Sequence, residues 1–157
     1  MARRNPFMSK KLAGKLLDDF SLFGSMPFYV IVTLVTYFAG NRLLFERLAY
    51  GFLLSFIVIV TIKHFHYKDR PQKEEFTMFM ERIAASSFPS THSLGVTGIG
   101  LLISISYPYP WVIALASALC LLVYIQRYVS KKHFVIDIVA SIAIAIAETV
   151  LIVKVVG

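Results

Sequence analysis

The sequence is poor in charged residues. Asp, Glu, Lys and Arg make up 16% of its 157 residues, whereas a soluble domain carries about 25%. Hydrophobic residues make up 57% of the chain, more than a water-soluble core of this size requires. This composition excludes an ordinary soluble domain and predicts a multi-pass integral membrane protein. The length suits one domain, so we expect residues 1–157 to form a single membrane-embedded unit.

Acidic residues are scarcer than basic ones. The 9 Asp and Glu residues against 16 Lys and Arg residues give a net charge of +7. In a soluble protein this excess would suggest nucleic acid, but here the basic residues flank apolar runs, where they contact lipid headgroups or an anionic substrate. We therefore expect no nucleic-acid partner. No cluster of carboxylates suited to Mg²⁺ is evident, so we expect no metal and no cofactor.

Cysteine is nearly absent. Cys120 is the only one, which excludes a disulfide within the chain and leaves the redox compartment undetermined. We expect no cleavable signal peptide, because the first apolar run begins after Gly24 and no convincing small-residue cleavage site follows it. We expect that run to act as an uncleaved membrane anchor.

Long apolar runs are what the sequence has in abundance. They predict an all-α, polytopic bundle of about five transmembrane helices, because each run approaches or reaches the length that crosses a hydrocarbon core. The stretch over 83–126 has His92 as its one ionisable residue and is divided by Pro108 and Pro110, since proline ends helices. The expected spans are residues 24–40, 48–62, 90–107, 111–127 and 134–156, which together form a core over 24–156.

The segment before the first span, residues 1–22, has a different pattern. A short basic tail comes first, and then Leu12, Leu16 and Phe20 recur at helical spacing among lysines and aspartates. This pattern predicts an amphipathic helix over 8–22 that lies in the membrane interface and does not cross it.

Three polar clusters interrupt the apolar pattern, and alternating topology places all three on the same side of the membrane. Ionisable groups this close to hydrocarbon are costly and usually functional. In the first cluster, Lys63 and Arg70 are seven positions apart, so a continuing helix would put both on one face, where they can bind one anion. Pro71 favours a helix end near Arg70. A solvated basic loop is the alternative interpretation.

The second cluster precedes an apolar run with Pro89, Ser90, Thr91 and His92. Pro and Ser in this position indicate the start of a helix. Free main-chain N–H groups at a helix start, together with the helix dipole, favour phosphate binding, and Ser90 can add a hydroxyl. The alternative is a plain helix cap with an interfacial histidine.

The third cluster begins at Arg127 and contains His133 and Asp137, which are four positions apart. One helix can place the last two on one face. A carboxylate that contacts one ring nitrogen fixes the histidine tautomer and leaves the other nitrogen free as a nucleophile. The alternative is an ion pair at the interface.

Together the three clusters resemble a known set of motifs. The patterns K-x6-R-P, P-S-x-H and R-x5-H-x3-D, in this order and between spans, are similar to the signature motifs of the type 2 phosphatidic acid phosphatase superfamily. The motifs cover residues 63–137. Gln126 stands where the family usually has Ser, and Thr91 stands where it often has Gly. The family often has six spans, one more than we expect here.

The resemblance implies a mechanism and assigns a role to each matched position. His133 attacks phosphorus and forms a phosphohistidine, Asp137 orients His133, and His92 protonates the leaving oxygen and later helps to activate water. The phosphate oxygens are bound by Lys63, Arg70, Ser90, Thr91 and Arg127. No metal is implied, because permanent cations take the place of magnesium.

The resulting hypothesis is an integral membrane phosphatase of a lipid phosphomonoester or diphosphate. Phosphatidic acid, phosphatidylglycerol phosphate and polyprenyl phosphates or diphosphates all fit as substrates. Two alternatives stay open: a lipid phosphotransferase that uses the same intermediate, and a non-catalytic membrane protein that binds lipid. The oligomeric state is not predicted.

Charges outside the motifs give further expectations. Counted by side, 13 Lys and Arg residues fall on the motif side and 3 on the other, if the N-terminal helix does not cross. Cytoplasmic loops are rich in Lys and Arg, so we expect a cytoplasmic active site. Separately, we expect the protein to lie in the plasma membrane. We expect Glu148 to extend to the opposite interface. Residues expected to contact headgroups, without a catalytic role, are His64, His66, Lys68 and Lys73.

Overall fold

The structure is a computed structural model that describes residues 21–72 and 78–157. Within these ranges every regular element is helical, which confirms the predicted all-α fold. The predicted amphipathic helix over 8–22 lies almost entirely outside the described residues. The elements in chain order are η1 (Ser21–Gly24), α2 (Met26–Phe38), α3 (Arg42–Phe65), α4 (Phe79–Ala85), α5 (Thr91–Ser106), α6 (Pro110–Val129) and α7 (Val135–Val155).

The five long helices match the five predicted spans. By length and composition, α3, α6 and α7 can each cross a membrane, whereas α2 and α5 are shorter apolar helices of 13 and 16 residues. At 1.5 Å per residue, α5 is about 24 Å long, somewhat less than a typical hydrocarbon core. The protein is therefore a helical membrane bundle in which three helices have full spanning length.

Helix α3 begins at Arg42, six residues before the predicted span, because its charged first turns are stabilised locally. The Asn41 side chain accepts a hydrogen bond from the Leu44 amide and caps the helix. Arg42 and Glu46 then form an ion pair one turn apart, with Nε and Oε1 separated by 2.8 Å. These polar residues extend the helix beyond the apolar run.

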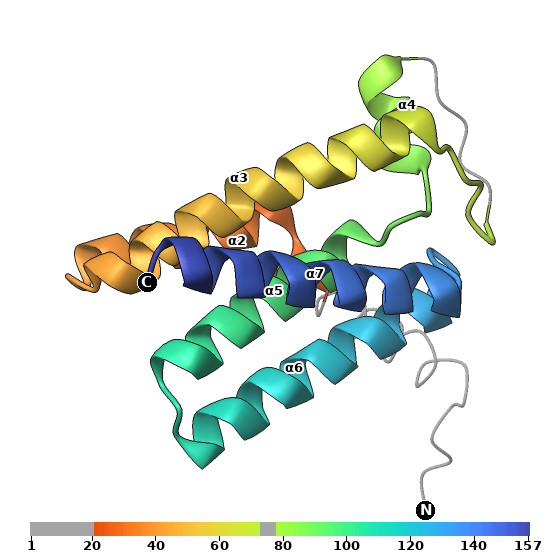
Figure 1. Ribbon diagram of the computed structural model, residues 1–157. Coiled ribbons are helices and arrows are strands. Elements are labelled where there is room, and N and C mark those ends of the chain that lie inside the picture. The colour runs from red at the N-terminus through yellow and green to blue at the C-terminus, as the bar shows by residue number, and fades with distance from the viewer. Residues whose placement is uncertain (1–20, 73–77) are drawn as a thin grey trace, which may run out of the picture.

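Helix α5 lies at the centre of the bundle. It contacts α2, α3, α6, α7 and η1, and α3 also contacts α7 (Figure 1). Ser90 caps α5 by accepting a hydrogen bond from the Ser93 amide. Helix α6 starts at Pro110. Proline lacks an N–H group, but the N–H of the first helical residue makes no hydrogen bond within the helix, so none is lost. The predicted division of this apolar stretch by prolines is thus confirmed.

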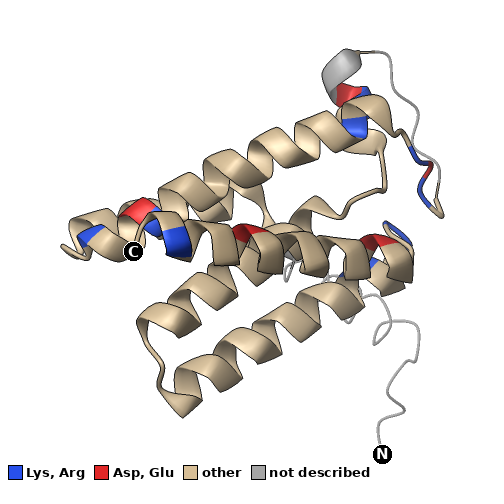
Figure 2. Ribbon diagram, in the orientation of Figure 1, with Lys and Arg blue, Asp and Glu red and all other residues tan. Residues whose placement is uncertain are grey.

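Charged residues gather at the two ends of the bundle (Figure 2). One end holds the end of α3, α4, the start of α5 and the turn between α6 and α7. Apolar side chains such as Ile57 and Leu121 are exposed along the helices between these ends, as expected for surfaces that face lipid.

Glu148 is an exception to this arrangement, and its predicted position was wrong. It is 7% exposed, and its Oε2 atom accepts a hydrogen bond of 2.5 Å from the Ser55 hydroxyl on α3. The reason is that α7 continues for seven residues beyond Glu148, which adds about 10 Å of helix between its backbone and the far end.

Candidate active site

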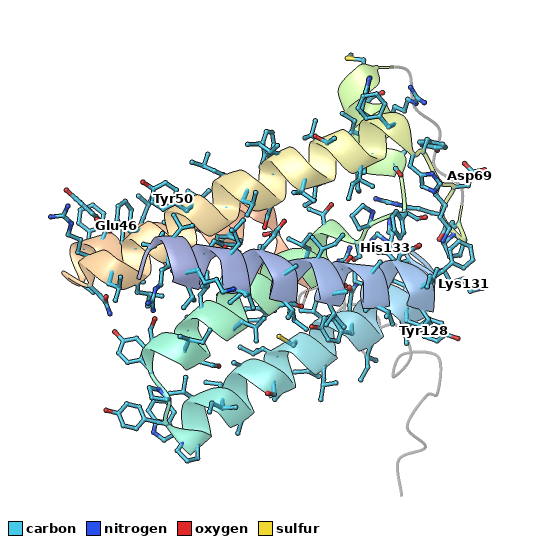
Figure 3. All side chains as sticks on the ribbon, in the orientation of Figure 1. Glu46, Tyr50, Asp69, Tyr128, Lys131 and His133 are labelled. Carbon is cyan, nitrogen blue, oxygen red and sulfur yellow. The ribbon has the colours of Figure 1, made fainter. Side chains whose placement is uncertain are left out.

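A cavity of about 310 Å³ lies at the end of the bundle where the three sequence clusters meet. Helix α3 and the loop after it bring Lys63 and Arg70, the start of α5 brings Thr91 and His92, and the α6–α7 turn brings His133. Figure 3 shows His133 at the same end as Asp69 and Lys131, opposite Glu46 and Tyr50. The apolar part of the wall consists of Met26, Phe56, Ile59, Val60, Ile83 and Ala84.

His133 is held in one orientation by the main chain. The residue is 3% exposed, and its Nδ1 atom lies 2.7 Å from the carbonyl oxygen of Ser87. A carbonyl oxygen only accepts hydrogen bonds, so this contact assigns the proton to Nδ1 and leaves a lone pair on Nε2. The geometry therefore suits Nε2 for nucleophilic attack.

The surroundings of His133 also keep its ring neutral. Burial is the largest cause and lowers the pKa of His133 to about 3, although the hydrogen bond to Ser87 opposes the shift. The nearby positive charges of Arg70, Lys63 and Arg127 lower the pKa further. At neutral pH the ring is uncharged, as a nucleophile requires.

In the described structure Asp137 forms no hydrogen bond with His133, which differs from the contact expected from their spacing. The Oδ2 atom of Asp137 accepts the Phe134 amide at 2.9 Å, and Oδ1 lies 2.6 Å from Lys68 Nζ. The reason is that α7 begins at Val135, so His133 precedes the helix and the four-residue rule does not apply. Asp137 instead caps the first turn of α7 and is fully buried.

Lys68 is the residue that sequence reasoning missed. Expected to contact headgroups, it pairs with Asp137 and lies over the rings of Phe134 and Phe88, at 4.7 and 5.9 Å from their centroids. A signal was available, because an acid inside an apolar segment needs a cation, and the loop after α3 supplies one on the same side.

Three carbonyl oxygens from residues 84–87, the end of α4 and the linker that follows it, hold three of the site residues. Ala84 accepts from the Arg70 guanidinium at 2.5 Å, Ser86 accepts from Lys63 Nζ at 2.9 Å, and Ser87 contacts His133. The linker is tied in turn to the loop after α3 by hydrogen bonds from Ser87 to the carbonyls of residues 68 and 69. Main-chain oxygens thus orient the two cationic side chains and His133 together.

The loop geometry differs from the sequence prediction for Arg70. Helix α3 ends at Phe65, five residues before Arg70, so Lys63 and Arg70 do not share a helix face. Both nevertheless line the cavity. The loop between them turns Arg70 back towards the end of α4, where its guanidinium group donates a hydrogen bond to the Ala84 carbonyl.

The first turn of α5 provides the second cluster. Ser90 is fully buried, and its Oγ accepts hydrogen bonds from the Ser93 amide and hydroxyl. The first amides of a helix lack acceptors within the helix, so those of Thr91 and His92 suit a phosphate oxygen. This turn packs closely on Gly24, because a Cβ atom built there would lie 2.2 Å from the His92 carbonyl oxygen.

Arg127 and Gln126 are buried at the end of α6. The Arg127 Nε atom donates to Gln126 Oε1 at 2.6 Å, so the residue that replaces the usual serine of the motif orients the arginine. The Arg127 carbonyl accepts the amides of Lys132 and His133 and closes the turn that leads to α7. Within residues 21–72 and 78–157, no group of three His, Cys, Asp or Glu residues is arranged to hold a metal ion.

Comparison with known proteins extends this description. A family model described as the PAP2 superfamily matches residues 46–157 and so spans all three clusters. No curated protein matches the chain.

Two solved structures are similar to the chain in fold. The crystal structure of LpxE from Aquifex aeolicus is 18% identical with a TM-score of 0.76, over 97% of this chain and 88% of that one. The first transmembrane PAP2 type phosphatidylglycerolphosphate phosphatase from Bacillus subtilis is 20% identical with a TM-score of 0.62, over 97% and 78%. At these identities the likeness is one of fold.

Proposed function

The chain belongs to the PAP2 superfamily, and we propose that it is a membrane phosphatase that hydrolyses a lipid phosphate through a phosphohistidine intermediate. The observation that carries this proposal is the environment of His133. Its ring is neutral, its Nδ1 proton is bound by Ser87, and its cavity is shared with two cations and a second histidine. A nucleophile with one free lone pair beside an anion site is what phosphoryl transfer requires.

The first half-reaction forms the phosphoenzyme. The Nε2 atom of His133 attacks phosphorus, and the bond between phosphorus and the leaving oxygen breaks. Lys63, Arg70 and Arg127 neutralise the oxygens of the transferring group, which is the main catalytic contribution in this chemistry. His92, protonated beside the bound dianion, gives its proton to the leaving oxygen.

The second half-reaction restores the enzyme. His92, now neutral, takes a proton from water as the water oxygen attacks phosphorus, and the bond from phosphorus to Nε2 breaks. Inorganic phosphate leaves, and His133 returns to its starting form. The Ser87 carbonyl keeps the Nδ1 proton in place through both steps and stabilises the ring when it carries phosphate. No step requires a metal ion.

The lining of the cavity supports a lipid as the substrate. Phe56, Ile59 and Val60 lie on the two turns of α3 that precede Lys63, and Met26 lies beside them at the start of α2. An apolar chain attached to a phosphate at Lys63 can lie along this wall. Phosphatidic acid, phosphatidylglycerol phosphate and polyprenyl phosphates or diphosphates all share this chemistry.

The charge distribution supports a cytoplasmic active site. Among the described residues, the site end of the bundle holds Lys63, Lys68, Arg70, Arg82, Arg127, Lys131 and Lys132, and the opposite end holds Arg42, Arg47 and Lys154 (Figure 2). Positive charge favours the cytoplasmic side. As a separate part of the proposal, we place the protein in the plasma membrane.

The experiment that tests the proposed function is a phosphate-release assay of the purified full chain in detergent. The panel contains the three lipid classes above, each with and without EDTA, and His133→Ala is the inactive control. We expect release from at least one lipid, unchanged by EDTA and absent in the variant. No release from any lipid, or release that needs added Mg²⁺, would contradict the proposal.

A further inference from the structure

Glu148 and Ser55 form a polar pair inside the apolar part of the bundle. The Ser55 hydroxyl on α3 donates to Glu148 Oε2 on α7 at 2.5 Å, and both residues are buried. Ser55 is ten residues before the end of α3, and Glu148 is thirteen residues after the start of α7, so the pair lies about 15–20 Å from the site end. That depth is near the middle of a hydrocarbon core.

The surroundings of Glu148 require a neutral carboxyl group. Its other oxygen, Oε1, is buried and has no hydrogen-bond partner in the described structure. No described cation forms an ion pair with Glu148, and Arg47 is two turns away from Ser55 along α3, about 12 Å. An unpaired charge at this depth is too costly, so the group is a carboxylic acid hydrogen-bonded to Ser55.

Small and apolar residues are also buried on both helices near this pair: Gly51 and Ile59 on α3, and Ala145 and Ile152 on α7. A Cβ atom built at Gly51 would lie 2.6 Å from the Tyr29 hydroxyl and an ordinary 3.4 Å from the Ile152 side chain, so this glycine makes room for Tyr29 of α2 where α3 contacts α7. One turn beyond Ser55, Ile59 packs with Ala145. Small residues let membrane helices come close, but apolar contacts alone tolerate sliding of one helix along the other. A directional hydrogen bond between buried polar groups fixes the register of packed helices.

Lys63 follows Ser55 on the same buried face of α3, two turns later, and α7 begins two residues after His133. A shift of α3 along α7 would therefore move the Lys63 ammonium group relative to His133. We propose that the Ser55–Glu148 hydrogen bond is a positioning clamp, which fixes the register of α3 against α7 and thereby places Lys63 opposite His133. This inference rests on the proposed function, because it gives Lys63 the role of binding the phosphate.

Vanadate binding tests the clamp without turnover. Its dissociation constant is measured by calorimetry on the purified full chain in detergent, for the wild type, Glu148→Gln and Glu148→Leu. We expect Glu148→Leu to bind vanadate about tenfold more weakly, since one buried polar contact is lost. Glu148→Gln keeps a group that bonds Ser55 and should bind like the wild type. The matched control is Glu46→Gln, an exposed acid on α3 that should have no effect.

A double variant separates a positioning role from a general loss of stability. If the clamp acts through Lys63, adding Glu148→Leu to Lys63→Met should weaken vanadate binding no further. Should Glu148→Leu not fold, Ser55→Ala removes the same hydrogen bond and carries the same expectations. Any of three results would overturn the clamp. The folded Glu148→Leu or Ser55→Ala variant could bind vanadate like the wild type, Glu148→Gln could lose as much affinity as Glu148→Leu, or the losses of affinity could add in the double variant with Lys63→Met. A wild type that binds vanadate but releases no phosphate from lipid would refute the proposed function alone.

Discussion

The Nδ1 atom of His133 lies 2.7 Å from the carbonyl oxygen of Ser87, which belongs to a different loop 46 residues earlier in the chain. This contact, and not one with Asp137, determines which ring nitrogen is free. It also joins the linker before α5 to the turn before α7. The second and third sequence clusters are therefore connected by a contact between a side chain and a main-chain carbonyl. The predictions below depend on this arrangement.

The first prediction concerns acid stability. Burial above all holds the pKa of His133 at about 3 in the folded protein, below its usual value of 6.5. As pH falls below 6.5 the unfolded chain binds a proton at this site that the folded protein does not, so stability decreases between pH 6.5 and 3. His133→Asn removes this contribution. The melting temperature in detergent should therefore fall less in His133→Asn than in the wild type between about pH 8 and pH 5. Equal decreases would show that His133 is not held neutral.

The second prediction separates Asp137 from the nucleophile. Since Ser87 orients His133, Asp137→Asn should still form the phosphoenzyme, with a rate reduced by less than about tenfold. Lys68→Met leaves a buried carboxylate without its cation and should destabilise the protein by about 3 kcal/mol, the lower end for a buried pair because Lys68 is partly exposed. The double variant should recover part of that loss. Rapid-quench kinetics and thermal melts measure the two effects. Complete loss of phosphoenzyme in a folded Asp137→Asn would return the orienting role to Asp137.

The positions of the helices could be predicted from the sequence because apolar runs and prolines act locally. The run before Lys63 and the break at Pro110 each determine an element without reference to the rest of the fold. The three clusters could also be assigned to one end, because alternating spans fix which loops share a side.

The contacts within the site could not be predicted in the same way. The partners of Lys63, Arg70 and His133 are main-chain oxygens of residues 84–87, at the end of α4 and just after it, and any residue type can supply a carbonyl. The prediction from the spacing of His133 and Asp137 was wrong because it assumed that both residues lie in one helix, whereas α7 begins two residues after His133. Glu148 was misplaced because the helical position of an acid does not reveal whether its partner is water or Ser55.

The third prediction tests the close packing of η1 on α5. A methyl group on Gly24 would meet the His92 carbonyl oxygen at 2.2 Å, so Gly24→Ala must move η1 and the turn that carries His92 apart. We expect kcat to fall by at least about tenfold, as a displacement of that size at a catalytic group implies. The matched control is Gly98→Ala on α5, the helix that carries His92. Its new methyl group would meet Tyr29 Oη at an ordinary 3.8 Å. Equal activity of the two variants would contradict the packing described here.

The fourth prediction concerns the side of the membrane. Gln72→Cys lies in the exposed loop at the site end, and Tyr109→Cys lies in the exposed turn at the opposite end, both in a Cys120→Ser background. With a cytoplasmic active site, an impermeant maleimide should label position 109 in intact cells and position 72 only after lysis. Labelling of position 72 in intact cells would place the site outside.

The central claim is that His133 carries the phosphate during turnover. The most direct measurement is base quench of the wild type during turnover of a ³²P-labelled lipid phosphate, in the presence of EDTA, followed by mapping of the labelled peptide and by acid treatment of a parallel sample. Phosphohistidine survives base and is lost in acid, which distinguishes it from a phosphoserine. We expect a base-stable label on His133 that is absent in His133→Ala. Turnover with no label, or a label on any other residue, would contradict it.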